Sequence, residues 1–516
     1  MQQPLYCSLF SRISLSFSMT DPRVVGYRAM AAGGGGNNLP FPQGNFDIPA
    51  LQAIYMAPPH QPQPPVSISP SMVGQETSDE TEIQNLMSGM DCHGDERLSL
   101  SDMEKFYNNS LLSDIKLRIG ENTFFAHKLI LVRSSEVFER MLSADWIDPN
   151  KGELELVEEP ECVKVFPSFL RFLYGCHIVL TAENALPALM LADKYNVADL
   201  RRVCIHFAMT NIIPKLQLKD VFHIWYQYAT KCYHQRLIAN CIQALSPKAD
   251  DIMSMPEWSH EWLNLDKEQL IEFLRSSDLT IRNEITLFYA VVKWIESPTH
   301  PDRLQNSEKL LRELMHFIRF PMMTPDHLDK LEHHKIIEQH KDLFLPLLLQ
   351  AYKFNSLPLE HRASIKDFTT SSFLLRNYTD LRWDKRIVLT GYSQYIKVSE
   401  VMPRFSTRSS AYPHTSWDWE IKIYPKGSSS NNDDFRAILY SNVVLDQPRP
   451  MEYLLSLVNN NAVLRTVSGK KNFSKTRYQV DTEIDKKVTL EELMTPGSPL
   501  LVNDCVILQV SIKPLQ

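Results

Sequence analysis

Hydrophobic periodicity changes twice along this chain, and that order limits the folds it can adopt. Residues 114–207 combine short alternating stretches with helical stripes, whereas residues 212–352 show helical spacing throughout. From residue 385 to residue 512 apolar residues alternate again, with Gly, Asn and Pro between the runs. Because 516 residues exceed the usual size of one hydrophobic core, this pattern predicts a multidomain protein whose regions belong to different fold classes.

The first 95 residues differ from the rest in composition. They contain the run Gly33–Gly36, a proline-rich stretch from Pro58 to Pro70 and no sustained apolar period. Such a segment cannot bury enough apolar surface to offset the ordering of its backbone, so we predict disorder for residues 1–95. Its opening residues also lack the basic start and the unbroken apolar stretch of a signal peptide.

The first folded region begins with a predicted hairpin and continues as a mixture of helices and short strands, which predicts an α+β unit. Five of its segments are the strand start at Asp114, Phe125–Leu129, Ser134–Met141, Phe172–Tyr174 and Leu191–Tyr195. In this order and spacing they resemble a BTB/POZ domain. Arg133 departs from the pattern of that family, which usually has a small residue at this position.

The second folded region is helical. Apolar faces recur around Phe288–Ile295, while Pro298 and Pro321 punctuate the pattern, which predicts an array of helices. From Ser276 to Pro321 the sequence resembles the BACK domain that follows BTB in adaptor proteins.

The last region is predicted to be all β. Trp417–Tyr424, Ala437–Tyr440 and Cys505–Ile512 alternate as strands do, which predicts a sandwich. Trp419–Gly427 and Leu500–Asp504 resemble the TRAF-like (MATH) sandwich. The whole order resembles the galectin-3-binding-protein-like group of BTB-BACK proteins, including its Transport and Golgi organisation type.

These changes also set the predicted domain boundaries. We expect a disordered N-terminal region at 1–95, an α+β BTB/POZ domain at 96–210, an all-α BACK helix array at 211–355, a linker at 356–384 and an all-β TRAF-like (MATH) sandwich at 385–516.

No catalytic motif appears in the sequence. It has no Walker loop, nucleophile elbow, HExxH, GxGxxG or kinase signature, so we predict neither catalysis nor a cofactor. The densest group of possible ligands is interpreted as a solvated helical face; it consists of His327, His333, His334 and His340. Because the eight cysteines include no CxxC pair, no metal site is predicted.

Charge and hydropathy exclude two classes of partner. Lys and Arg number 54 against 61 Asp and Glu, a net charge of −7 that offers no positive field to a nucleic-acid backbone. No apolar run approaches the roughly 18 residues that a membrane span requires. The dispersed cysteines favour a reducing compartment, so we expect a cytoplasmic protein without nucleic-acid or membrane partners.

The family resemblance implies a substrate adaptor of a cullin-3 RING ubiquitin ligase. In such an adaptor the BTB domain dimerises and binds cullin-3, and another domain, here the C-terminal sandwich, recruits an unknown protein substrate. The sequence lacks the paired ligands of a RING domain, so the ligase activity has to come from other subunits. Two alternatives are a non-catalytic BTB scaffold that clusters partners and a secreted adhesion protein.

The resemblance also implies a cullin-binding site. In cullin-binding BTB domains a Phe-x-x-Met helix is followed by an apolar-x-Glu element that enters a cullin pocket. Phe138 and Met141 match the helix here, Trp146 is the expected apolar anchor and Asp148 the acid. Asp in place of Glu is a departure, since its side chain is one methylene shorter. The alternative is that Trp146 only covers the BTB core.

A predicted dimer interface precedes the first BTB strand. Its apolar residues are Leu98, Leu100, Met103, Phe106 and Leu111, which form a face too extensive for one disordered tail. Two polar residues nearby are interpreted as structural. We expect His127 to bond backbone groups in the BTB core and Asp114 to accept hydrogen bonds from nearby amides.

Overall fold

The computed structural model describes residues 94–143, 152–410, 416–427, 434–441, 449–473 and 488–515. The chain divides into two compact units, residues 1–105 and 106–516. In the first unit the described part is helix α3 (Glu96–Glu104) with its flanks, and the Asp95 carboxylate caps this helix. The disorder predicted for residues 1–95 concerns residues that lie, apart from the last two, outside the described part.

The second unit opens with a small mixed sheet. Strand β1 (Ile115–Ile119) is antiparallel to β2 (Asn122–Ala126) and parallel to β3 (Glu153–Leu156), in the order β2–β1–β3. Alternation along β1 places Leu117 in the core and turns Lys116 outward, as a half-buried strand requires. The helices of this region are α4 (Lys128–Ser134), α5 (Glu136–Ser143), α6 (Pro160–Gly175), α7 (Ala185–Lys194) and α8 (Ala198–Phe207).

The predicted helical region is confirmed. Two π-helical segments, Ala208–Ile212 and Val221–Tyr226, interrupt the regular α-helical pattern near its start. Its α-helices are α9 (Leu218–Asp220), α10 (Gln227–Lys231), α11 (Gln235–Leu245), α12 (Ala249–Ser254), α13 (Ser259–Leu263), α14 (Lys267–Arg275), α15 (Glu284–Ile295), α16 (Pro301–Gln305), α17 (Ser307–Leu314), α18 (Pro325–Glu332), α19 (Lys335–Gln339) and α20 (Lys341–Ser356). Among the described helices, none is both long and apolar enough to cross a membrane.

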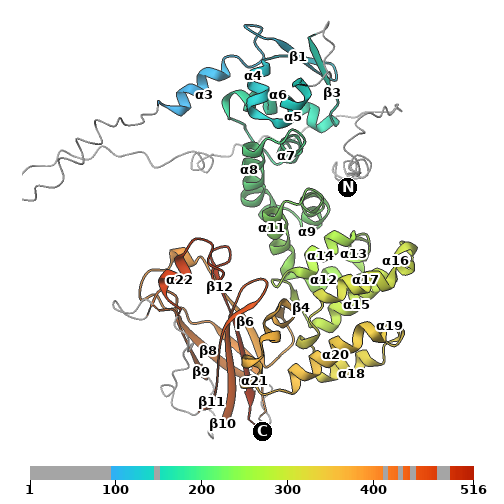
Figure 1. Cartoon of the computed structure of the whole chain (residues 1–516), viewed down its shortest axis with the longest axis vertical. Coiled ribbons are helices and arrows are strands. Elements are labelled where there is room, and N and C mark those ends of the chain that lie inside the picture. Colours follow the sequence, from blue (N-terminus) through green and yellow to red (C-terminus); the bar gives the residue numbers. More distant parts are fainter. Residues whose placement is uncertain are drawn as a thin grey trace, which may run out of the picture. The chain divides into compact units, whose positions relative to one another are not determined.

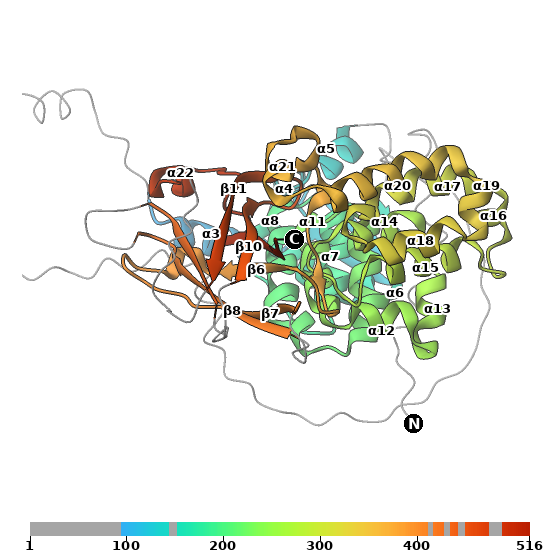
Figure 2. The same ribbon diagram turned by 90° about the horizontal axis from the view of Figure 1, so that it is seen from below.

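Two antiparallel sheets form the C-terminal region, with strand orders β11–β10–β12–β6 and β7–β8–β9. Their strands are β6 (Asp384–Thr390), β7 (Arg404–Arg408), β8 (Ser416–Tyr424), β9 (Arg436–Ser441), β10 (Arg449–Val458), β11 (Val463–Phe473) and β12 (Cys505–Pro514); helix α22 (Leu490–Met494) precedes β12. Both sheets contribute to one hydrophobic core, in which the Trp419 and Phe473 rings lie 5.0 Å apart between centroids. The predicted C-terminal β region is confirmed (Figures 1 and 2), and its specific likeness to a TRAF-like sandwich stays a prediction.

The segment predicted as a linker, residues 356–384, packs against both of its neighbouring regions. Helix α21 (Leu359–Ser364) contacts β10 and β11 of the larger sheet. Strand β5 (Asn377–Tyr378) pairs in parallel with β4 (Thr280–Ile281) of the helical region. These contacts tie the helical region to the β region through the chain that connects them.

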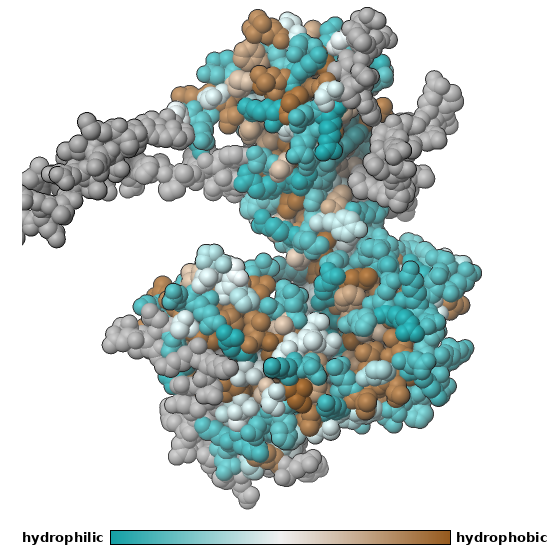
Figure 3. All heavy atoms as spheres, in the orientation of Figure 1, coloured by the Kyte–Doolittle hydropathy of each residue, from teal (hydrophilic) through white to brown (hydrophobic). Residues whose placement is uncertain are grey.

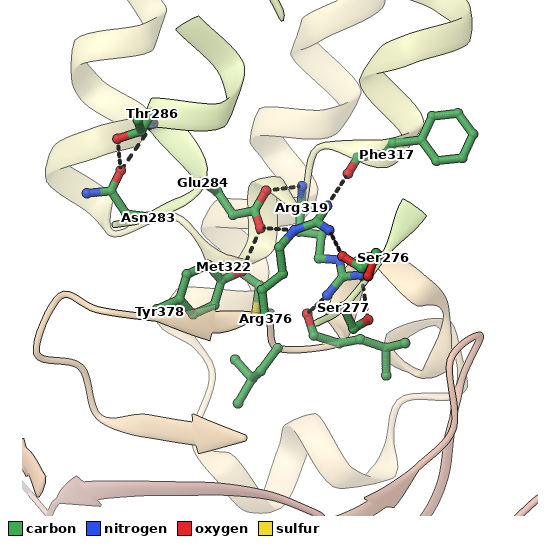
Figure 4. Close-up of polar contacts among 12 residues, drawn as sticks. Ser276, Ser277, Asn283, Glu284, Thr286, Phe317, Arg319, Met322, Arg376 and Tyr378 are labelled. Carbon is green, nitrogen blue, oxygen red and sulfur yellow. Dashed lines mark hydrogen bonds and ion pairs between the residues drawn. The ribbon is translucent and has the colours of Figure 1, made fainter. Parts of the chain in front are cut away.

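A buried group of charges holds this segment against the helices (Figure 4). Glu284, the first residue of α15, pairs with Arg376 at 2.8 Å, and both side chains are fully buried. Tyr378 donates its hydroxyl hydrogen to the same carboxylate at 2.7 Å, and the backbone amide of Arg319 donates to it at 3.1 Å. Burial alone would raise the pKa of Glu284, but the two arginines lower it, so the carboxylate stays ionised.

The guanidinium of the second arginine also has hydrogen-bond partners. The Arg319 guanidinium donates to the carbonyl of Leu374 at 3.0 Å and to the hydroxyl of Ser277 at 2.8 Å. Burial lowers the pKa of Arg319 to about 9, and the neighbouring Arg376 adds to this effect. One buried carboxylate thus faces two buried guanidinium groups, and the group joins α15, the Arg319 turn and the segment before β6.

Lys513, at the end of β12, makes the stability of the second unit pH-dependent. Its ammonium group donates to the carbonyl of Asn355 at 3.4 Å. Burial lowers the pKa of Lys513 to about 8, Arg362 adds to this effect, and Glu452 and Asp384 oppose it. The unfolded chain, with the ordinary lysine pKa of 10.5, therefore binds more protons than the folded chain between these two values. The contribution of Lys513 to stability therefore rises with pH across that window.

We therefore expect Lys513→Met to remove this rise in stability between about pH 8 and about pH 10.5. The measurement is the urea midpoint of wild type and variant at intervals across the window. Lys353→Met serves as the control, because Lys353 is an exposed lysine on α20, and this variant should keep the wild-type pH dependence. Parallel curves for wild type and Lys513→Met would contradict the prediction.

Candidate functional site

Helix α5 carries two of the predicted cullin-binding residues, and Ser135 fixes its start. The Ser135 hydroxyl accepts a hydrogen bond from the amide of Phe138 at 3.1 Å and donates to the carbonyl of Tyr195 at 2.5 Å. This cap satisfies an amide at the helix start and ties α5 to the end of α7. Arg133, at the end of α4, is exposed, so this departure from the family pattern places no charge in the core.

Phe138 points inward from α5. Its side chain is fully buried, and its ring stacks on Tyr195 with centroids 4.6 Å apart and an interplanar angle of 12°. The Tyr195 hydroxyl donates to Glu158, and burial together with that carboxylate raises the pKa of Tyr195. Phe138 therefore supports α5 from the core and offers no surface to a partner.

The outer part of the predicted cullin site is only partly described. Met141 is half-buried near the end of α5, beside the half-buried Leu142, so an edge of this helix is accessible. The expected anchor Trp146 and the expected acid Asp148 lie outside the described residues. The structure thus places Phe138 and Met141 on one helix with different exposures.

The predicted dimer residues differ in exposure. On α3, Leu98 is 66% exposed, and Leu100 and Met103 are half-buried. In the second unit Phe106 is half-buried, with its ring edge-on to His127, and Leu111 is 59% exposed.

Sequence reasoning missed two leucines near these positions. Leu112 is 78% exposed and Leu129, on α4, is 77% exposed. Figure 3 shows hydrophobic residues among polar ones on the surface of the region that contains α4, α5 and α6. The two leucines add exposed apolar side chains to the set predicted for the dimer interface.

His127 and Asp114 organise the backbone beside these leucines. The Nε2 of His127 lies 2.8 Å from the carbonyl oxygen of Leu111 and therefore donates to it, which leaves Nδ1 to accept from the Tyr174 hydroxyl at 2.9 Å. Asp114 accepts from the amide of Lys128 at 2.8 Å at the start of α4. Both residues have the structural roles expected from the sequence.

A second polar group was not predicted from the sequence. Asp193, at the end of α7, lies beside Cys232 and His234, which flank the turn between α10 and α11. The carboxylate is 2.6 Å from His234 Nε2 and accepts from the Tyr228 hydroxyl at 2.6 Å. The spacing of Cys232 and His234 was the sequence signal that could have indicated this group. The third residue, Asp193, is 41 positions from His234, so the sequence does not show that it belongs to the group.

Two of the four histidines that were considered as possible ligands have structural roles. His333 bonds the carbonyl of Asp329 at 2.9 Å, and His334 caps α19. Within the described residues, the group with ligand atoms close enough to hold a metal ion is Asp193, Cys232 and His234.

Two domain families match this chain. Residues 103–212 match the BTB/POZ domain, and residues 222–333 match the BACK domain, described as BTB And C-terminal Kelch. The chain therefore carries a BTB domain followed by a BACK domain, as the sequence motifs predicted. Both are protein-interaction modules, so the chain has the domain composition of a protein-interaction adaptor.

Individual proteins resemble this chain over the same regions. BTB/POZ domain-containing protein 17 from Xenopus laevis is 29% identical over 294 residues, covering 56% of this chain and 59% of that protein. Kelch-like protein 7 from Homo sapiens is 22% identical, and the match covers 57% of this chain and 46% of that protein. Galectin-3-binding protein from Mesocricetus auratus is 25% identical, and the match covers 58% of this chain and 50% of that protein. The chain spans about half the length of the relatives it matches.

Proposed function

We propose that this chain is a substrate adaptor of a cullin-3 RING ubiquitin ligase. The observation that carries the proposal is the order of its regions: a BTB domain, a BACK domain and a C-terminal β region, with the connecting segment held against the helices by the Glu284–Arg376 pair. This order suits a protein that binds a scaffold at one end and a target at the other.

The proposal gives the BTB domain two tasks and the C-terminal β region one. The BTB domain forms a homodimer, with the exposed leucines 98, 111, 112 and 129 as candidate contact residues. It also binds cullin-3 through the end of α5 and the residues that follow, and the C-terminal β region holds a protein substrate. A cullin-dependent role requires access to a cytoplasmic ligase, so cytoplasmic localisation belongs to the same proposal.

We expect Trp146→Ala to weaken cullin-3 binding and to leave the dimer intact. Aromatic anchors dominate interfaces of this kind, and removing one costs about 2–4 kcal/mol, or roughly a 30- to 1000-fold loss of affinity. The test is titration calorimetry of the full chain with purified cullin-3, with dimer mass from light scattering on the same sample. Leu304→Ala, an exposed leucine on α16, is the control and should bind like wild type.

Two results would contradict this assignment in different ways. If a folded Trp146→Ala dimer kept full affinity, Trp146 would not be the anchor. If wild type failed to bind cullin-3 at all, the adaptor proposal would fail, and a BTB scaffold without ligase function would replace it. A mobility shift of the cellular protein after glycosidase treatment would instead favour the secreted alternative.

A further inference from the structure

A carboxylate, a thiol and an imidazole, three groups that can bind a metal ion, lie close together, and they come from both matched domains. Asp193 belongs to the BTB match, and Cys232 and His234 belong to the BACK match. One ligand atom of each lies within 4.8 Å of the others. The Asp193 side chain is 17% exposed and that of His234 is 10% exposed, so the group is sheltered but reachable from solvent.

The backbone fixes two of these groups before any ion binds. Cys232 ends α10, Tyr233 adopts a left-handed conformation with φ of 55°, and His234 donates its amide hydrogen to the carbonyl of Ala229 at 2.9 Å. The Tyr233 side chain is 72% exposed, whereas its two neighbours are half-buried beside Asp193. Thiol and imidazole are therefore presented together as a preformed pair.

Hydrogen bonds already orient the carboxylate. Arg201 donates from Nε to one oxygen at 2.6 Å, and His234 and Tyr228 share the other oxygen. The first oxygen can keep its arginine while the second binds an ion, which is the usual arrangement of an outer hydrogen bond around a metal ligand.

We propose that Asp193 Oδ2, Cys232 Sγ and His234 Nε2 bind one zinc ion. Sulfur, imidazole and carboxylate together are a ligand set typical of zinc, and the Tyr228 hydroxyl or a water molecule completes a tetrahedron. The oxygen and nitrogen must separate from 2.6 Å to about 3.3 Å to accept bonds of about 2.0–2.1 Å. This inference is independent of cullin binding.

Zinc binding releases a proton from the thiol. A thiol binds zinc as the thiolate, so the Cys232 S–H bond breaks, a sulfur–zinc bond forms and one proton leaves to solvent. Zinc takes the Nε2 lone pair of a neutral imidazole, so the hydrogen that Nε2 shares with Asp193 leaves that nitrogen and Nδ1 carries the hydrogen that the ring retains. Asp193 Oδ2 exchanges this hydrogen bond for a bond to zinc. The bound ion would cross-link the end of α7 to the turn between α10 and α11.

Cobalt provides the test, because thiolate-bound Co²⁺ has a near-ultraviolet charge-transfer band and four-coordinate Co²⁺ has intense visible bands. We expect chelator-treated full-length protein to bind one Co²⁺ per chain with both signals, and one equivalent of Zn²⁺ to remove them. Cys232→Ser should lose the charge-transfer band and weaken Co²⁺ binding about 100-fold or more. His234→Gln should also weaken binding. Cys176→Ser, another half-buried cysteine, is the matched control and should behave like wild type.

A second measurement covers the case in which a variant does not fold. X-ray absorption of zinc-loaded wild type should fit one sulfur at about 2.3 Å and nitrogen or oxygen ligands at about 2.0–2.1 Å. The proposal is overturned if wild type gives no cobalt bands, if Cys232→Ser keeps the charge-transfer band, or if the absorption data require no sulfur or more than one.

Discussion

Glu284→Ala is expected to destabilise the second unit by about 3–5 kcal/mol, because it leaves two arginines buried without their counter-charge. Arg376 has no exposed surface and pairs with Glu284 at 2.8 Å, and Arg319 donates its backbone amide to the same carboxylate. The pKa of Glu284 is lowered in the folded protein, so its contribution is present above the ordinary glutamate pKa and lost as pH falls through the folded value. Chemical denaturation near neutral pH measures the effect.

Glu308→Ala is the matched control for this experiment. Glu308 also pairs with an arginine, Arg312, at 2.8 Å, but both side chains are more than half exposed. Water solvates the charge that remains, so this variant should unfold at the wild-type midpoint. If Glu284→Ala and Glu308→Ala lowered the free energy of unfolding by the same amount, burial would not increase the cost of removing the carboxylate, and the prediction would be wrong. Hydrogen exchange of the β4–β5 pair should accelerate in Glu284→Ala alone.

Phe138→Ala is expected to cost the folded BTB domain about 3–5 kcal/mol, the usual range for removing a fully buried aromatic ring. The Phe138 ring stacks on Tyr195, and the Ser135 hydroxyl bonds the Tyr195 carbonyl, so the truncated side chain would leave a cavity between α5 and the end of α7. The midpoint of thermal unfolding should fall. If the chain forms the proposed dimer and binds cullin-3, the dimer yield and the cullin-3 affinity should fall only in proportion to the fraction of unfolded protein.

Leu129→Ala is the control, because it also removes a large apolar side chain but removes it from the surface. Leu129 is a large apolar residue on the neighbouring helix α4, but it is 77% exposed, so its removal leaves no cavity. Its thermal midpoint should stay at the wild-type value. A stable Phe138→Ala dimer with reduced cullin-3 affinity would contradict the inward role of Phe138 and restore it as a contact residue.

The local pattern of the sequence predicted much of the fold. Alternation in Ile115–Ile119 indicated a strand with one buried face, and the structure has that strand with that burial. Such predictions succeed because a strand and a helix bury side chains at fixed and different periods. Asp114 and His127 were also predictable, because the BTB motif places both next to backbone groups that need partners.

The candidate site was less predictable. Phe138 and Met141 lie three residues apart on one helix, and the sequence assigned both to the same surface. Their exposures differ because Tyr195 stacks on Phe138 and covers it. Tyr195 lies 57 positions after Phe138 in the sequence. The role of a side chain on an amphipathic helix depends on what packs against each face, and no local pattern contains that information.

By itself the sequence determined the order of fold classes along this chain and the BTB and BACK signatures within it. Only the tertiary structure brought Glu284 to Arg376, 92 residues away, and Asp193 to His234, 41 residues away. The physical reason is that periodicity and motifs act over one element, whereas a buried charge is stable only when its partner arrives from another.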